Sequence, residues 1–269
     1  MNLFIKPYQY INALSLDVAA GAVISALFFA SIFDVPVSIY ALAALALTVW
    51  IIYTLDHLRD AMTIPRIAST DRHRFHQKHF RFIVATLVFV MVLDFVLLWF
   101  VTEEVLLIGI VLWFVVLVYL LVQRYLKFMK ELFVAALYTA GILVPSMALA
   151  AWELNSIHSI IIGKYFVTAW MNLLLFSLFD HQEDQQHQQH SFVTWFGPAS
   201  TRFGILFLGL INILSGVWLW SFDPSVAVIF VSMNILLLTI LFFQRHFISN
   251  NYYRIAGDAV FFIPVFYLL

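Results

Sequence analysis

The amino-acid sequence predicts an all-α membrane protein, a bundle of nine transmembrane helices. Of its 269 residues, 64% are hydrophobic and only 11% are charged, whereas soluble domains average about 45–50% apolar and about 25% charged residues. The hydrophobic residues also form continuous runs close to the roughly 20 residues that a helix needs to cross a bilayer. This composition excludes a soluble globular protein, and it equally excludes a disordered chain.

Nine apolar runs follow one another with short connections. A transmembrane β-barrel would alternate apolar and polar residues, but these runs are continuous, as in Ile205–Trp220, and are therefore predicted to be helices. They leave no room for a separate soluble domain, so we expect residues 1–269 to form a single transmembrane domain. The runs lie at 11–33, 36–57, 81–102, 105–123, 132–152, 158–180, 202–221, 224–244 and 252–269.

Individual residues justify these assignments. Asp17 interrupts the first run and a second run follows at once, so we expect a retained helix rather than a signal peptide. Pro36 and Pro224 stand where the second and eighth runs begin, which is where a helix tolerates proline. Pro145 and Pro264 lie inside the fifth and ninth runs, where we expect them to kink the helix.

The basic residues indicate the orientation. With nine spans, thirteen of the 14 Lys and Arg residues fall on one side of the membrane, and Lys164 is the exception. By the positive-inside rule that side is cytoplasmic, which places the N-terminus inside and the C-terminus outside. We expect a multi-pass protein of the plasma (inner) membrane. The chain has no cysteine and a net charge of -1, so it has no thiol chemistry, and we expect no nucleic-acid partner.

Two pairs of carboxylates mark the candidate site. Asp56 and Asp60 end the second run, and Asp180 and Asp184 end the sixth. A spacing of four places each pair on one helical face. Both runs lead toward the cytoplasmic side, so we expect the two pairs at the same depth. Facing carboxylates repel unless a divalent cation lies among them, and Mg²⁺ held by a few carboxylates and by phosphate oxygens fits this pattern.

With nine runs and these two DxxxD pairs, the chain resembles the UbiA superfamily of intramembrane prenyltransferases. Three further segments are similar to the superfamily's second motif, to the region after its fourth helix and to its last helix, namely 171–197, 118–145 and 253–265. The chain departs from the superfamily at Ile52, where the first motif usually has Asn, and at Gln123-Arg124, where Lys-Arg is usual. The Arg-Pro element after the first motif is also absent.

The resemblance implies Mg²⁺-dependent transfer of a prenyl group from a prenyl diphosphate to a lipophilic or aromatic acceptor. It implies that Asp56, Asp60, Asp180 and Asp184 hold the metal at a site that faces the cytoplasm. Tyr53 shares a helical face with the first pair, and we expect it near the allylic cation. The expected diphosphate-binding residues are basic residues of the same side, namely Arg66, Arg72, Arg74, Arg124 and Lys130.

Three alternatives stay open at this point. A membrane terpene cyclase of UbiA type would ionise the same diphosphate without an acceptor. A di-iron membrane oxidoreductase would use the histidines of the cytoplasmic side, because imidazole suits iron; they are His57, His73, His76, His79, His181, His187 and His190. A non-catalytic UbiA-like protein is the third, in view of Ile52 and Gln123.

Asp17 and Asp94 both fall inside apolar runs. A carboxyl group within a membrane helix is energetically expensive and indicates a function or a hydrogen-bonding partner. Asp17 is a candidate for orienting the acceptor and Asp94 for pairing with an unidentified partner, and a neutral carboxyl group hydrogen-bonded across the bundle is the alternative for either.

Overall fold

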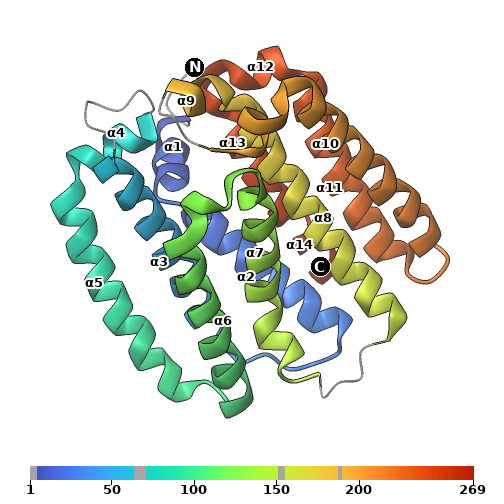
Figure 1. Ribbon diagram of the computed structural model, residues 1–269. Helices are drawn as coiled ribbons and strands as arrows, with labels where there is room; N and C mark the ends of the chain where they lie inside the picture. The colour runs from blue at the N-terminus through green and yellow to red at the C-terminus, as the bar shows by residue number, and fades with distance from the viewer. Residues whose placement is uncertain (1–4, 64–70, 151–154, 187–189) are drawn as a thin grey trace.

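The computed structural model describes residues 5–63, 71–150, 155–186 and 190–269 (Figure 1). These residues form α-helices and short 3₁₀ turns, and no strand occurs among them, so the predicted all-α fold is confirmed. The helices are α1 (Ile5–Ala13), α2 (Leu16–Ile32), α3 (Ile39–Thr63), α4 (Asp71–Lys78), α5 (Phe80–Leu97), α6 (Glu103–Val122), α7 (Lys130–Met147), α8 (Ser156–Phe179), α9 (His181–Gln186), α10 (Phe192–Leu219), α11 (Pro224–Phe242), α12 (Gln244–Ile248), α13 (Tyr252–Ala259) and α14 (Val265–Leu268).

Within the described ranges, seven helices are long and apolar enough to cross a membrane: α3, α5, α6, α7, α8, α10 and α11. The outer surface of α5, of α6 and of the 3₁₀ turn Leu98–Phe100 between them is apolar, with Phe82, Trp99 and Leu121 largely exposed. A soluble protein does not present so large an apolar surface to water. The chain is therefore an integral membrane protein whose outer helices contact lipid.

The first and last apolar runs are broken into shorter helices. Ser15 has a left-handed backbone, with φ of 54°, and it separates α1 from the 17-residue α2. In the last run, a 3₁₀ turn at Val260–Phe262 follows α13, and Pro264 then precedes the short α14. Where the structure describes them, the nine runs are mainly helical, but the count of nine membrane crossings stays a prediction.

Buried polar side chains join the helices. The Oδ2 atom of Asp94 accepts a hydrogen bond of 2.9 Å from the Thr48 hydroxyl, which links α5 to α3. Asp17 accepts one of 2.7 Å from Asn12. Lys164 is buried in the bundle, where its ammonium donates to the Asn212 side chain at 2.8 Å, and its assignment to the outer side stays a prediction. These partners compensate for the loss of hydration.

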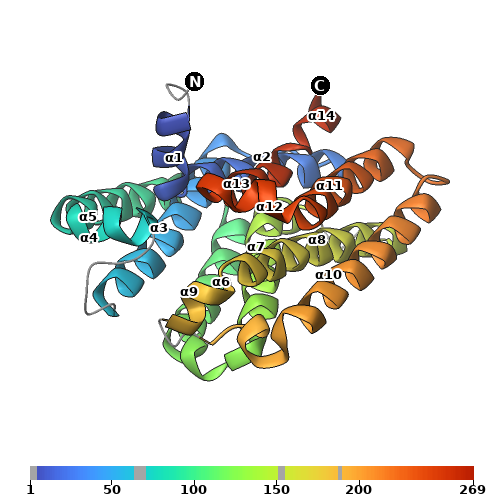
Figure 2. The same ribbon diagram turned by 90° about the horizontal axis from the view of Figure 1, so that it is seen from above.

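The short helices identify one end of the molecule. In Figure 1, α4, α9 and α12 lie together at the top of the bundle, and we call this the polar end. Seen from above that end, α13 lies beside α2 and α11, and it also packs against α8 (Figure 2). The core beneath contains fully buried aromatic rings, among them Phe28, Tyr165 and Phe230.

Candidate active site

A cavity of about 650 Å³ is lined by residues of α1, α3, α4, α7, α8, α9 and α13. This volume is typical of sites for small molecules. The cavity wall contains seven of the residues that the sequence proposes for the site, which are Tyr53, Asp56, Asp60, Arg74, Lys130, Asp180 and Asp184. The two acid pairs, more than 100 residues apart in the chain, are therefore brought to one cavity.

One acid pair lies on α3. This helix continues to Thr63, beyond the predicted end of the run at 57, so Asp56 and Asp60 are both inside it. With 3.6 residues per turn, Tyr53 lies about one turn before Asp56 on the same face. All three side chains line the cavity as a consequence.

The other pair spans a helix junction. α8 ends at Phe179, Asp180 is its C-cap, and Asp184 belongs to α9. The backbone N–H of Asp184 donates to the carbonyl of Asp180 at 2.9 Å, which preserves the helical spacing across the junction. The second pair therefore also presents two carboxyl groups to the cavity.

The cavity wall changes from charged to mainly apolar along α7 and α8. On α8, the wall runs from Asp180 at the helix end through Phe176 and Leu173 to Ala169, which lies about 16 Å farther along the helix axis. On α7 it runs from Lys130, in the first turn, inward to Tyr138. A ligand with an anionic head and an apolar tail would match this arrangement.

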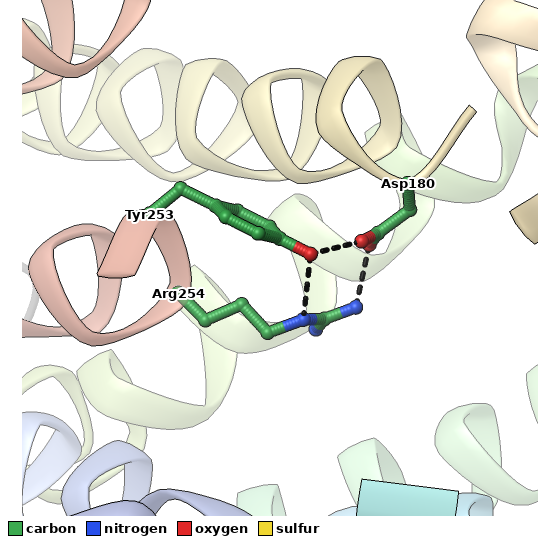
Figure 3. A network of polar contacts seen from close by, with 3 residues as sticks. All are labelled: Asp180, Tyr253 and Arg254. Carbon is green, nitrogen blue, oxygen red and sulfur yellow. Dashed lines mark hydrogen bonds and ion pairs between the residues drawn. The ribbon is translucent and has the colours of Figure 1, made fainter. Parts of the chain in front are cut away.

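Asp180 is engaged by two residues of α13 (Figure 3). The Nη2 atom of Arg254 lies 2.5 Å from the Oδ2 atom of Asp180, and the Tyr253 hydroxyl donates to Oδ1 of the same carboxylate. The Nε atom of Arg254 also donates to the Tyr253 oxygen, at 3.3 Å. The sequence analysis did not single out either α13 residue, and Arg254 was one of thirteen basic residues assigned only to the cytoplasmic side.

The carboxyl group of Asp184 is partly buried next to Asp180. Burial raises the pKa of its carboxyl group above the ordinary value, and the charge of Asp180 raises it further. A hydrogen bond with Ser191 and the charges of Lys130 and Arg254 act in the opposite direction without cancelling the shift. An additional cation at this position would favour the ionised carboxylate.

The donor set fits Mg²⁺ bound together with a phosphate ligand. Among the described residues, no three His, Asp or Glu side chains are close enough to hold a metal ion by themselves. Mg²⁺ does not require this, because it commonly uses one or two carboxylates, with water and substrate phosphates completing its shell. Asp56, Asp60 and Asp184 supply such carboxylates in the cavity wall, whereas both oxygens of Asp180 already have partners.

Comparisons with known proteins identify the fold. The sequence matches no family model and no curated protein. The structure matches a UbiA homolog from Archaeoglobus fulgidus bound to GPP and Mg²⁺, with 13% identity and a TM-score of 0.66, over 95% of this chain and 98% of that one. It also matches a UbiA homolog from Aeropyrum pernix K1, with 15% identity and a TM-score of 0.63, over 96% and 98% of the two chains. The chain has the UbiA fold.

A digeranylgeranylglyceryl phosphate synthase has the same fold, at 14% identity and a TM-score of 0.56, with 97% of each chain covered. The expected structural resemblance to UbiA proteins is thus confirmed. At these identities the likeness establishes the UbiA fold, and the chemistry of the site has to be argued from its own residues.

Gln123 stands at one of the departures from the usual UbiA pattern. Its Nε2 atom lies 3.4 Å from the Oδ1 atom of Asp56, and its Oε1 atom lies 3.4 Å from the Tyr119 hydroxyl. A neutral amide therefore approaches the first acid pair where a charged side chain is usual. Ile52, which is another of these departures, is not among the described residues that line the cavity.

The expected diphosphate-binding residues of this UbiA fold are only partly described. Arg74 and Lys130 line the cavity. Arg66 lies outside the described residues. Arg72 belongs to α4, and Arg124 belongs to the 3₁₀ turn Gln123–Tyr125, but the side chains of both lie outside the described part.

The di-iron alternative gains no support from the described histidines. The rings of His57 and His76 approach with centroids 5.2 Å apart, and His57 contacts Ser15 at 3.1 Å. No third metal-binding side chain completes a cluster in the described part of the chain. The side chains of His73 and His187 lie outside it.

Glu131 is a buried cavity-wall residue that the sequence analysis missed. Its Oε1 atom accepts a hydrogen bond of 2.9 Å from the backbone N–H of Phe192, the first residue of α10. The first N–H groups of a helix lack partners within the helix. Glu131 therefore fixes the start of α10 against α7.

Replacing Glu131 by Leu is expected to lower the free energy of unfolding by about 1–3 kcal/mol, because a buried N–H group loses its acceptor. Glu131→Gln should cost less, since the amide oxygen can still accept. Thermal unfolding in detergent measures both changes. The exposed Glu104, in the first turn of α6, provides the matched control Glu104→Leu, and equal unfolding temperatures for the two Leu variants would contradict this role.

Proposed function

We propose that this chain is a Mg²⁺-dependent intramembrane prenyltransferase, which transfers a prenyl group from a prenyl diphosphate to a lipophilic or aromatic acceptor. The observation that carries the proposal is the cavity, in which two acid pairs and basic side chains form one end and apolar side chains form the inner wall. The UbiA homolog from Archaeoglobus fulgidus, whose fold this chain shares, is bound to GPP and Mg²⁺ in one structure and to DMAPP and Mg²⁺ in another.

The charged end would bind the diphosphate. Asp56, Asp60 and Asp184 are the residues that would hold Mg²⁺, with Asp180 beside them. When bound, the metal neutralises the charge that develops on the diphosphate as the bond to the prenyl carbon breaks. Lys130 and Arg74 would donate charge-assisted hydrogen bonds to the phosphate oxygens.

The inner wall would protect the prenyl cation. Heterolysis leaves the bonding electron pair on the diphosphate and produces an allylic cation, which the acceptor captures through its own electron pair before losing a proton. The apolar lining excludes water, and the rings of Tyr53, Tyr138, Phe176 and Phe261 can stabilise the cation through their faces. We infer that the polar end, which carries this site, faces the cytoplasm, as the distribution of basic residues predicts.

The test is consumption of prenyl diphosphates by the purified protein in detergent. Dimethylallyl, geranyl and longer diphosphates are supplied with Mg²⁺, with and without a membrane lipid extract as the source of acceptors. We expect diphosphate release that depends on the extract and on Mg²⁺. Removing Mg²⁺ with EDTA should slow it by about 100-fold or more, because metals contribute several kcal/mol of charge stabilisation, and added Mg²⁺ should restore the rate.

The same assay separates the alternatives. Release without any acceptor, together with a hydrocarbon or terpene alcohol as the product, would establish a terpene cyclase instead. No consumption of any diphosphate would contradict the enzymatic proposal and favour a non-catalytic protein. About two iron atoms per chain, found by elemental analysis, would support the histidine-based oxidoreductase.

A further inference from the structure

Arg254 occupies an unusual position for a cation in a site of this kind. Four basic residues line the cavity, together with seven Asp and Glu residues. Arg74 and Lys78 lie on α4, and Lys130 lies on α7. Arg254 is the basic residue that α13 contributes. It therefore places a positive charge beside the second acid pair, on a different helix from the other cations.

The guanidinium group is held in a fixed orientation. Asp180 accepts from its Nη2 atom at 2.5 Å, and the Tyr253 hydroxyl accepts from its Nε atom at 3.3 Å (Figure 3). The rings of Phe176 and Tyr253 lie 5.6 Å and 5.5 Å from its central carbon. Such contacts restrict a planar guanidinium and reduce the entropy that it loses on binding a ligand.

The same group retains donors for a ligand. A guanidinium has five N–H donors, and within the described residues the hydrogen bonds of Arg254 use one from Nε and one from Nη2. The Nη1 atom has no hydrogen-bonded acceptor in that part of the chain. About 23% of the side chain is still accessible, and the residue lines the cavity. Planar, forked donors of this type match the oxygens of a diphosphate.

We infer that Arg254 is a diphosphate-binding residue, and that Asp180 and Tyr253 anchor its guanidinium group. In this arrangement Asp180 serves as the counter-ion of Arg254 rather than as a metal ligand, and the second acid pair offers Asp184 alone to Mg²⁺. This inference rests on the proposed function, since it assigns a binding role within the same site. Its consequence is that Arg254 contributes, together with Lys130 and Arg74, to the part of the affinity for diphosphate that does not depend on metal.

The experiment measures the binding of inorganic pyrophosphate and of geranyl diphosphate by calorimetry in the presence of EDTA. Arg254→Gln is expected to weaken this metal-free binding by about 10- to 100-fold, as loss of a hydrogen bond to a charged group predicts. Arg254→Lys should retain the charge and lose only the forked geometry, so its affinity should lie between that of the wild type and that of Arg254→Gln. Arg245→Gln is the matched control, because Arg245 is exposed on α12 and does not line the cavity.

A second arm titrates Mg²⁺ at a fixed concentration of geranyl diphosphate and follows binding rather than turnover. Asp184→Asn is expected to raise the half-saturating Mg²⁺ concentration about tenfold, because it removes a metal ligand. Asp180→Asn should raise that concentration less than Asp184→Asn does, because Asp180 would act through Arg254 and the diphosphate rather than as a ligand of the metal. Equal increases in the two variants would overturn the inference.

Loss of Arg254 alone leaves the part-buried Asp180 without its cation and can impair folding. The double variant Asp180→Asn/Arg254→Gln removes both charges, and its melting temperature checks that the fold survives. If Arg254→Gln and the double variant bind the ligands in EDTA as tightly as the wild type does, the role of Arg254 is refuted and the proposed function stands. If the wild type binds neither pyrophosphate nor geranyl diphosphate, with or without Mg²⁺, both the role of Arg254 and the proposed function are refuted.

Discussion

Replacing both Asp56 and Asp60 by Asn is expected to reduce prenyl-diphosphate consumption by about 10³-fold, while the protein stays folded. Both carboxylates line the cavity from one face of α3, about a turn apart. Asn preserves their size but removes the charges that would hold Mg²⁺. Loss of about 4 kcal/mol of transition-state stabilisation, which is within the range attributed to metal ions, corresponds to this factor.

The measurement is release of diphosphate at saturating Mg²⁺, with the melting temperature recorded in parallel. The matched control is Asp34→Asn, since Asp34 is exposed, lies in a connection and has a left-handed backbone that Asn also adopts. If the double variant of Asp56 and Asp60 releases diphosphate at the wild-type rate, the first acid pair takes no part in the reaction.

Replacing Gly257 by Ala is expected to destabilise the protein by about 1–3 kcal/mol, as overpacking of a filled interior does. A Cβ atom at this position on α13 would lie 2.5 Å from the Oδ1 atom of Asn172 and 2.5 Å from the Cε1 atom of Phe176. Both are side chains of α8 that line the cavity. α13 would have to move away from α8, and it would take Arg254 away from Asp180.

The expected observation is a decrease in melting temperature of about 2–4 °C for each kcal/mol, accompanied by weaker binding of diphosphate. Gly163→Ala is the control, because Gly163 is also helical and a Cβ atom there would meet no other atom within 4 Å. Equal melting temperatures for the two variants would show that the close approach of α13 to α8 is not required.

Local patterns allowed much of this arrangement to be predicted. The apolar runs indicated the helices, and the spacing of Asp56, Asp60, Asp180 and Asp184 indicated two acidic faces at one end of the bundle. Helical periodicity and the alternation of direction between successive spans are sufficient for these inferences. The predicted acid pairs do line one cavity, although their metal-binding role stays a prediction.

The contacts that define the site in detail were not predictable in this way. Arg254 and Asp180 are 74 positions apart in the sequence. Glu131 is 61 positions from Phe192, whose backbone N–H donates a hydrogen bond to it. Hydropathy and charge patterns describe each segment separately and contain no information on such pairings. The break at Ser15 was missed for a similar reason, because a single left-handed residue leaves the apolar character of the run unchanged.

The first helix determines how the protein should be produced for these experiments. α1 has only nine residues, and it supplies Tyr10, Asn12 and Ala13 to the cavity wall. A deletion or substitution that disturbs α1 would therefore change the site that the assays examine, so each variant described above has to be made in a chain that keeps α1 intact.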